Sequence, residues 1–303
     1  MEKFDVVVLG SINLDVMVTV NQFPKYGDTM IAKTIEILPG GKGANQAITV
    51  AKLGKKVAFL GAVGNDSAGK QMLDNFTSYG IDTQFIQIDK ENGTGTFVPI
   101  VDENSENTMV GTLGANNTLS SEFVSKVFDS IESDILLLQM ETSFDSVLTA
   151  MKKAKEKGMF VILDPAPAER FRPEALEYAD LVTPNSQETE FITGIKVDDK
   201  VTAIEAAKKL ERMGVRNSII KMGSKGSLVY QAGEVEFIPS LKVKAQNTVG
   251  AGDTFAGALA CSYSEQADIV KAVKYGNAAA GLKVSRIGGQ NAIPTHDEVL
   301  QQL

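Results

Sequence analysis

The chain has 303 residues, of which 43% are hydrophobic and 22% are charged, and its formal net charge is −8 at pH 7. These values are typical of a soluble globular protein, and the negative charge disfavours a broad basic surface for nucleic acid. One His and one Cys leave little room for a histidine triad or a multi-histidine metal centre and exclude an internal disulfide, so the chemistry must rest mainly on carboxylates, lysines, amides and backbone groups.

The N-terminal residues lead directly into a short apolar run at residues 6–10. This run is too short for the core of a signal peptide or for a membrane span, and charges interrupt every longer apolar stretch. A single cysteine is also typical of a reducing compartment. We therefore expect a cytoplasmic protein with no membrane partner.

Short apolar runs alternate with helical patterns along most of the chain. Residues 6–10 form a continuous β-branched run closed by Gly-Ser, which is typical of a buried strand. Strands alternating with helices predict an α/β fold with a mostly parallel central sheet flanked by helices on both faces. Further strands are predicted at 57–60, 135–138, 160–163, 179–183 and 218–221, and helices at 43–53, 67–79, 143–156, 202–213 and 255–263.

Two segments, approximately 15–37 and 95–112, break this alternation. Both contain alternating apolar and polar residues without a helical stripe, which predicts antiparallel strands that stand off the main sheet. We interpret them as two insertions that form a small β lid; ordinary edge hairpins of the main sheet are the alternative. No repeat, low-complexity tract or polar linker divides the chain, so a single domain over residues 1–303 is predicted.

The glycine-rich segment at residues 247–257 is the strongest local motif. Its glycines allow backbone N–H groups to converge on an anion, and a helix that begins there adds a favourable dipole. A carboxylate in a loop that only held phosphate would repel its ligand. Asp253 is better explained as a base that takes a proton from an attacking hydroxyl, although a helix N-cap is the alternative.

Three other segments carry candidate ligands for hydroxyls or phosphates. Residues 39–47 contain a Gly-Gly-Lys-Gly cluster that lacks the Ser or Thr of a nucleotide loop and therefore favours a polyol. Residues 64–71 fit G-x-x-x-x-G-K but end in Gln71, so a strand-to-helix turn is favoured there. Asn13 and Asp15 lie two apart after the first strand and suit vicinal hydroxyls, with a capped turn as the alternative.

Asn185 and Glu188 follow a strand that Pro184 ends. In isolation their spacing favours a capping box, and the functional alternative places Glu188 near magnesium through water. The Gly-Ser-Lys-Gly turn at residues 223–226, shortly after Lys221, could also contact a nucleotide.

Taken together, these motifs resemble the ribokinase-like (pfkB) carbohydrate kinases, and the resemblance covers essentially the whole chain in the family's order. It implies a parallel sheet with a β lid over a sugar, magnesium with ATP, and a homodimer formed through the lid. It also implies Asp253 as the base and the N–H groups of Gly250, Ala251 and Gly252 as the anion hole. The sugar would be bound by Asn13, Asp15, Gly41, Lys42, Gly43, Asn45 and Glu141.

The resemblance further implies the residues of the nucleotide and cation sites. Glu188 would serve magnesium through water. The ATP site would comprise Asn185, Lys221, Gly223, Ser224, Lys225, Gly226, Gly252 and Asn277. A monovalent-cation site for potassium, formed mostly by backbone, would involve Asn247, Val249, Lys283, Arg286, Gly288 and Ala292.

This chain departs from the family at Asn247, where the family has an Asp. An amide oxygen still coordinates a cation but brings no charge, so weaker potassium binding is expected. The leading hypothesis is ATP-dependent phosphorylation of the primary hydroxyl of D-ribose, giving ribose 5-phosphate. The alternatives are a kinase for deoxyribose or another small sugar and, less favoured because Asp253 is retained, a non-catalytic sugar or nucleotide sensor.

Overall fold

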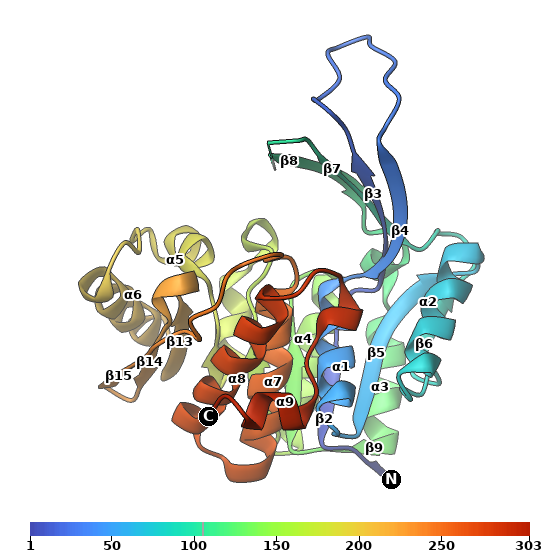
Figure 1. Cartoon of the computed structure of the whole chain (residues 1–303). Helices are drawn as coiled ribbons and strands as arrows, with labels where there is room; N and C mark the ends of the chain where they lie inside the picture. The colour runs from blue at the N-terminus through green and yellow to red at the C-terminus, as the bar shows by residue number, and fades with distance from the viewer. Residues whose placement is uncertain (105) are drawn as a thin grey trace.

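The computed structural model describes residues 1–104 and 106–303, and its central feature is a nine-stranded sheet in the order β15-β14-β13-β12-β11-β10-β2-β5-β6 (Figure 1). The seven neighbouring strands from β13 to β6 are parallel, and only β14 runs in the opposite direction, because it pairs antiparallel with both β13 and β15. The strands are β2 (Val6–Leu9), β5 (Val57–Gly64), β6 (Ile86–Asp89), β10 (Ile135–Leu138), β11 (Phe160–Leu163), β12 (Leu181–Val182), β13 (Asn217–Lys221), β14 (Ser227–Gln231) and β15 (Glu234–Ile238). The predicted mostly parallel sheet is confirmed.

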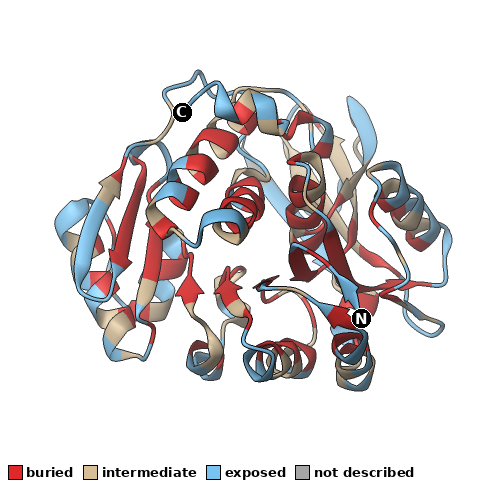
Figure 2. Cartoon of the chain, turned by 90° about the horizontal axis from the view of Figure 1, so that it is seen from below, coloured by how far each residue is buried: buried red, intermediate tan, exposed pale blue. Residues whose placement is uncertain are grey.

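Helices cover both faces of this sheet (Figure 2). Successive residues of a strand point to opposite faces, so the continuous apolar strands of this sheet place apolar side chains on both faces, and the helices bury them. In β2, Val6 and Val8 join one hydrophobic cluster while Val7 and Leu9 join another. The first cluster packs under α1 (Lys42–Lys52), α2 (Ser67–Ser78), α7 (Ala251–Gln266), α8 (Ile269–Val284) and α9 (His296–Leu300), and the second under α3 (Ser121–Ser130) and α4 (Phe144–Glu156).

The remaining elements are short or lie at the ends of the sheet. These elements are α5 (Ser186–Thr193), α6 (Lys200–Arg212), the paired strands β1 (Glu2–Lys3) and β9 (Ile131–Glu132), and the 3-10 helices η1 (Gly114–Thr118), η2 (Ala168–Arg170), η3 (Pro173–Tyr178), η4 (Gly223–Lys225) and η5 (Gln290–Ala292). A third hydrophobic cluster joins α6 to β13 and β14.

The two predicted insertions form a separate four-stranded sheet in the order β4-β3-β7-β8, which rises from one edge of the domain (Figure 1). Its strands are β3 (Asn13–Thr19), β4 (Thr34–Gly40), β7 (Gly95–Val101) and β8 (Asn107–Thr112). The β lid is therefore confirmed and the edge-hairpin alternative is wrong. One detail differs from the expectation, because β3 and β7 pair in parallel, while each hairpin is antiparallel.

The helix after the glycine loop begins at Ala251, four residues before the predicted start. Gly250 adopts a left-handed conformation (φ 75°), which ends the turn before it and lets the helix begin inside the loop. This shift moves Asp253 from a loop into the first helical turn. The other predicted helices agree with the structure within about two residues at either end.

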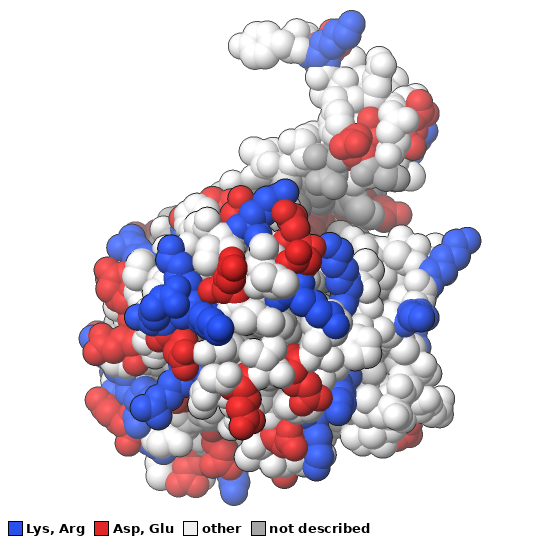
Figure 3. Space-filling view, turned by 90° about the vertical axis from the view of Figure 1, so that its left-hand side faces the viewer, with Lys and Arg blue, Asp and Glu red and all other residues white. Residues whose placement is uncertain are grey.

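None of the helices in the described residues has the length and apolar character needed to cross a membrane. On the face shown in Figure 3, Lys and Arg side chains are interspersed with Asp and Glu side chains. That face therefore offers no uniform basic surface.

Candidate active site

The predicted site residues gather where parallel strands end. Glu141 follows β10, Asn185 follows β12 and Lys221 ends β13. Asp164, which was not predicted as a site residue, follows β11 at the same edge. The carboxyl ends of parallel strands share one edge, and ligands bind where the strand order reverses direction. In this sheet β5 lies on one side of β2, and the later strands β10 and β11 lie on its other side, so the strand order reverses at β2. This edge is therefore the expected position of a site. The lid rises from the same edge (Figure 1).

Asp253 lies in the first turn of α7, and only 8% of its surface is exposed. Its Oδ2 accepts a hydrogen bond of 2.8 Å from Asn45 Nδ2 on α1. The two helices pack closely because residue 257 is glycine: an added β-carbon would lie 2.7 Å from Cβ of Thr49. Burial raises the pKa of Asp253 to about 6, although Lys42 and the Asn45 hydrogen bond oppose the rise. The carboxylate is thus ionised at neutral pH yet close to its pKa, as suits a general base.

Asn45 is itself oriented by a chain of amides. Its Oδ1 accepts from Gln290 Nε2 at 3.0 Å, which leaves the NH₂ group of Asn45 for Asp253. The Oε1 of Gln290 in turn accepts from Asn75 Nδ2 at 2.8 Å. Gln290 was not predicted as a site residue, because a lone glutamine near the C-terminus carries no sequence signal.

The glycine loop presents backbone donors beside Asp253. The first N–H groups of a helix have no acceptor within the helix, so those at the start of α7 are available to an anion. Of the three predicted donors, Ala251 N–H is directed to Thr248 O at 3.2 Å, a long bond that closes the turn. Gly250 and Gly252, the other two predicted donors, line the same cavity as Asp253.

Asp15, Lys42 and Glu141 form a charged group that interacts with Asp253. Burial and the neighbouring carboxylates of Glu141 and Asp253 raise the pKa of Asp15 to about 6, against the opposing effect of Lys42. Burial alone would lower the pKa of Lys42, but nearby carboxylates outweigh it, so that pKa is raised. These carboxylates are Asp253, Glu141, Asp164 and Glu188. A polar group of this kind suits hydroxyl donors and acceptors.

Close backbone approach holds the loops predicted to bind the sugar in place. Gly41, which precedes α1, has φ 96°, and an added β-carbon would lie 2.6 Å from Ser11 O. At Gly43 the β-carbon would lie 2.5 Å from the carbonyl carbon of Gly10. On the other side, Asn116 Nδ2 donates to Asn13 Oδ1 at 2.8 Å. Asn116 was missed by sequence reasoning, since it lies about 100 residues from its partner.

The cavity beside the glycine loop has a volume of about 340 Å³, within the range of small-ligand pockets. Lys221 Nζ lies 2.9 Å from Asp164 Oδ1 in its wall, and both side chains are largely buried. Ser224 and Lys225 do not line it, and Lys225 Nζ instead donates to Asp198 O at 2.6 Å. Predicted ATP residues that do line it are Asn185, Lys221, Gly223, Gly226, Gly252 and Asn277, together with Glu188.

Glu188 closes a capping box at the start of α5: its two oxygens accept from Asn185 N at 2.7 Å and Asn185 Nδ2 at 2.8 Å. Burial raises its pKa, while Lys221 opposes the rise. Across residues 1–104 and 106–303, no three Asp, Glu, His or Cys side chains gather as direct metal ligands. This donor set fits magnesium that is carried by phosphate and water, with Glu188 as an outer partner, because magnesium retains much of its hydration.

The residues predicted for potassium do not fit a cation in the same way. Asn247 turns its amide nitrogen toward Gly288 O at 3.2 Å, and its oxygen accepts from Val249 N–H at 3.0 Å. The ammonium of Lys283 donates to the same Gly288 carbonyl at 3.0 Å. Arg286 instead pairs with Glu298. Donors thus occupy Gly288 O and Asn247 Oδ1, two of the oxygens predicted for the cation.

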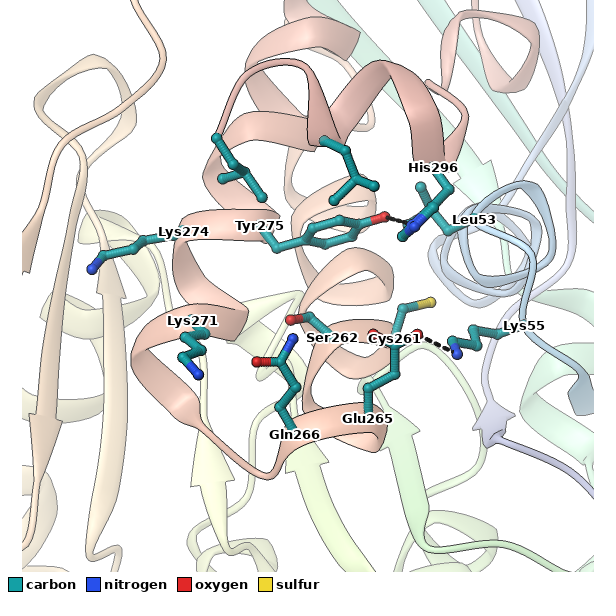
Figure 4. Close-up of a pocket in the computed structure, with 12 residues that line it drawn as sticks. Leu53, Lys55, Cys261, Ser262, Glu265, Gln266, Lys271, Lys274, Tyr275 and His296 are labelled. Atoms are coloured by element: carbon teal, nitrogen blue, oxygen red, sulfur yellow. Dashed lines mark hydrogen bonds and ion pairs between the residues drawn. The ribbon is translucent and has the colours of Figure 1, made fainter.

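A second hollow lies toward the C-terminal end of α7, and the only His and Cys of the chain line it (Figure 4). His296 Nδ1 shares a 2.8 Å hydrogen bond with Tyr275 Oη, and Cys261 is buried, which raises the pKa of its thiol. Lys55 pairs with Glu265 there. None of the predicted site residues lines this hollow.

The comparisons with known proteins agree with this geometry. Residues 3–296 match the pfkB family of carbohydrate kinases. The chain is 40% identical to a ribokinase of Haemophilus influenzae, over 98% of this chain and 97% of that protein, and 34% identical to a deoxyribokinase of Salmonella typhi, over 99% and 98%. Among solved structures it resembles Arabidopsis thaliana ribokinase complexed with ribose and ATP (TM-score 0.91, 30% identity, 100% and 99% covered) and Thermotoga maritima ribokinase (0.89, 37%, 98% and 98%).

Proposed function

This chain belongs to the pfkB family of carbohydrate kinases, and on that premise we propose that it transfers the γ-phosphoryl group of ATP to the primary hydroxyl of D-ribose, giving ribose 5-phosphate and ADP. The observation that carries the proposal is Asp253. It lies in the first turn of α7, held by Asn45 on the sugar side and bordered by the glycine loop on the nucleotide side.

In the transfer step, Asp253 accepts the proton of the sugar's primary hydroxyl. The oxygen forms a bond to the γ-phosphorus as the bond from that phosphorus to the bridging oxygen of ADP breaks. With a pKa of about 6, the carboxylate is roughly nine-tenths ionised at pH 7. Helix N–H groups at the start of α7 stabilise the charge on the moving phosphoryl group.

Local positive charge allows an acidic chain to bind a polyphosphate. Lys42 and Lys221 both line the nucleotide cavity, and the neighbouring carboxylates raise the pKa of each lysine against the effect of burial. Magnesium bound with ATP would neutralise further phosphate charge, and Glu188 would hold one of its waters. The field that attracts ATP is therefore confined to one cavity, whatever the net charge of the molecule.

The sugar side would bind vicinal hydroxyls through Asn13 and Asp15. Asp15 lies directly over Gly40, where an added β-carbon would be 2.2 Å from its Oδ2, so its position depends on that glycine. A carboxylate that accepts from two adjacent hydroxyls favours ribose over 2-deoxyribose. The test is kcat/KM for the two sugars: the proposal requires a preference for ribose, and a preference for 2-deoxyribose would reassign the substrate, in line with the deoxyribokinase likeness.

The lid supports two further parts of the proposal. It would close over the sugar and exclude water, so that the sugar outcompetes hydrolysis. It also exposes apolar side chains, and we propose a cytoplasmic homodimer formed through them; light scattering should give twice the mass of 32.4 kDa. These exposed side chains are Tyr26, Ile31, Ile35, Ile37, Met109 and Val110.

Potassium activation, which the resemblance implies, is not part of this proposal, because Gly288 O and Asn247 Oδ1, two of the oxygens predicted as its ligands, already accept hydrogen bonds.

A further inference from the structure

Lys283 is the buried charge that the proposed reaction leaves unexplained. It lies in the last turn of α8, with 2% of its surface exposed. Its ammonium donates to Gly288 O at 3.0 Å, and no carboxylate in the described part of the chain lies within 4 Å of it. A buried ammonium without an ion-pair partner is costly, so its retention points to a role.

The Lys283 side chain reaches the back of the glycine loop. A β-carbon added to Gly250 would lie 3.8 Å from Cε of Lys283, which places the ammonium behind the start of α7. Burial lowers the pKa of Lys283, and the charge of Asp253 opposes this change. The charge of Asp253 therefore has the largest favourable electrostatic effect on this ammonium, although the two groups form no direct ion pair.

The hydrogen bonds around Lys283 leave little room for a free cation. Gly288 O accepts from the ammonium and from Asn247 Nδ2, and Asn247 Oδ1 accepts from Val249 N–H. A second ammonium, that of Lys52, donates to Asn291 O at 3.1 Å, three residues along the chain from Gly288. A potassium ion bound at Gly288 O would have to displace its donors and lie beside the like charge of Lys283.

We propose that Lys283 is a tethered replacement for a monovalent cation: its fixed charge supports the glycine loop that receives the phosphoryl group. Asn247 fits the same arrangement, because a neutral amide can donate to Gly288 O whereas a carboxylate could not. The inference rests on the proposed kinase function and adds to it that the reaction is independent of potassium. Lys283 is a positioning residue, since it acts on phosphate through the loop.

The first experiment uses the unmodified protein in potassium, sodium or tetramethylammonium chloride at equal ionic strength. We expect kcat, the Kd of ADP measured by calorimetry and the Tm to agree within about twofold, or within about 1 °C for Tm, across the three salts. Activation of more than fivefold by potassium, or a potassium-specific rise in Tm, overturns the inference. Absence of sugar phosphorylation in every salt instead overturns the proposed function, so the two failures are distinguishable.

The second experiment removes the charge of Lys283 and then adds a carboxylate at position 247. Lys283→Met keeps the length of the side chain but removes its charge, and in tetramethylammonium it should lower kcat and weaken ADP binding at least tenfold. Adding Asn247→Asp to that variant should create potassium dependence of both kcat and Tm. Lys271→Met, at an exposed position of the same helix, is the control and should match the unmodified protein. Full activity of Lys283→Met in tetramethylammonium would contradict the proposal, and if that variant does not fold, the salt comparison still decides.

Discussion

Replacing Asp253 with Asn removes the proposed base while keeping its shape. The amide can still accept the hydrogen bond of Asn45 through its oxygen, so the first turn of α7 should stay in place. A positioned general base contributes about 10²–10⁴-fold, and kcat should fall by that factor, equivalent to about 3–5 kcal/mol in the barrier. The assay is steady-state ADP release at saturating ribose and ATP. Unchanged turnover would refute the role of Asp253.

Stability separates this effect from misfolding. The pKa of Asp253 rises from 3.8 to about 6 on folding, so the folded state binds the proton more tightly. Ionisation of this carboxylate therefore lowers the free energy of unfolding as the pH rises from 4 to 6, by at most about 3 kcal/mol in total. Asp253→Asn should have a Tm at pH 8 equal to or above that of the unmodified protein. Asp268→Asn, at the partly exposed N-cap of α8, is the matched control and should leave kcat unchanged.

Three further predictions follow from other contacts. Since Asn45 lowers the pKa of Asp253, Asn45→Leu should shift the acid limb of the kcat/KM profile upward from about pH 6 by roughly one unit; an unmoved limb would contradict this. Gly43→Ala would bring a β-carbon within 2.5 Å of the backbone after β2, and the Tm should fall because the free energy of unfolding drops by about 1–3 kcal/mol. Lys221→Met should cost about 3–5 kcal/mol in urea unfolding because it leaves Asp164 buried without its partner, and adding Asp164→Asn should recover part of the loss.

Local patterns predicted six of the nine strands of the central sheet, the helices α1, α2, α4, α6 and α7, and the lid. They did not predict β6, β14 and β15 or the helices α3, α8 and α9. Val6, Val7 and Val8 are β-branched, and with Leu9 they form a continuous apolar strand that is buried on both faces. The lid could be predicted because residues 15–37 and 95–112 lack a helical stripe, whereas the parallel pairing of β3 with β7 could not, because register between distant segments leaves no mark on either one. The early start of α7 was missed because glycines in a first helical turn look like a loop.

The candidate site could be predicted where residues follow strand ends or glycine turns. Asp253, Asn45 and Lys42 all do, and the structure brings them together. Gln290 could not be predicted, because its role depends on packing between distant elements. Lys283 was placed in the cation site from its position in the resemblance alone. Only the fold reveals that its ammonium donates to Gly288 O, one of the oxygens predicted for the cation.

ADP release by the purified protein, measured with ATP and magnesium over a panel of pentoses and hexoses, tests the central claim most directly. We predict that ribose accelerates ADP release far above the sugar-free rate, with the highest kcat/KM in the panel and one ribose 5-phosphate formed for each ADP. ADP release that no sugar accelerates, or that yields inorganic phosphate in place of a sugar phosphate, would contradict the account.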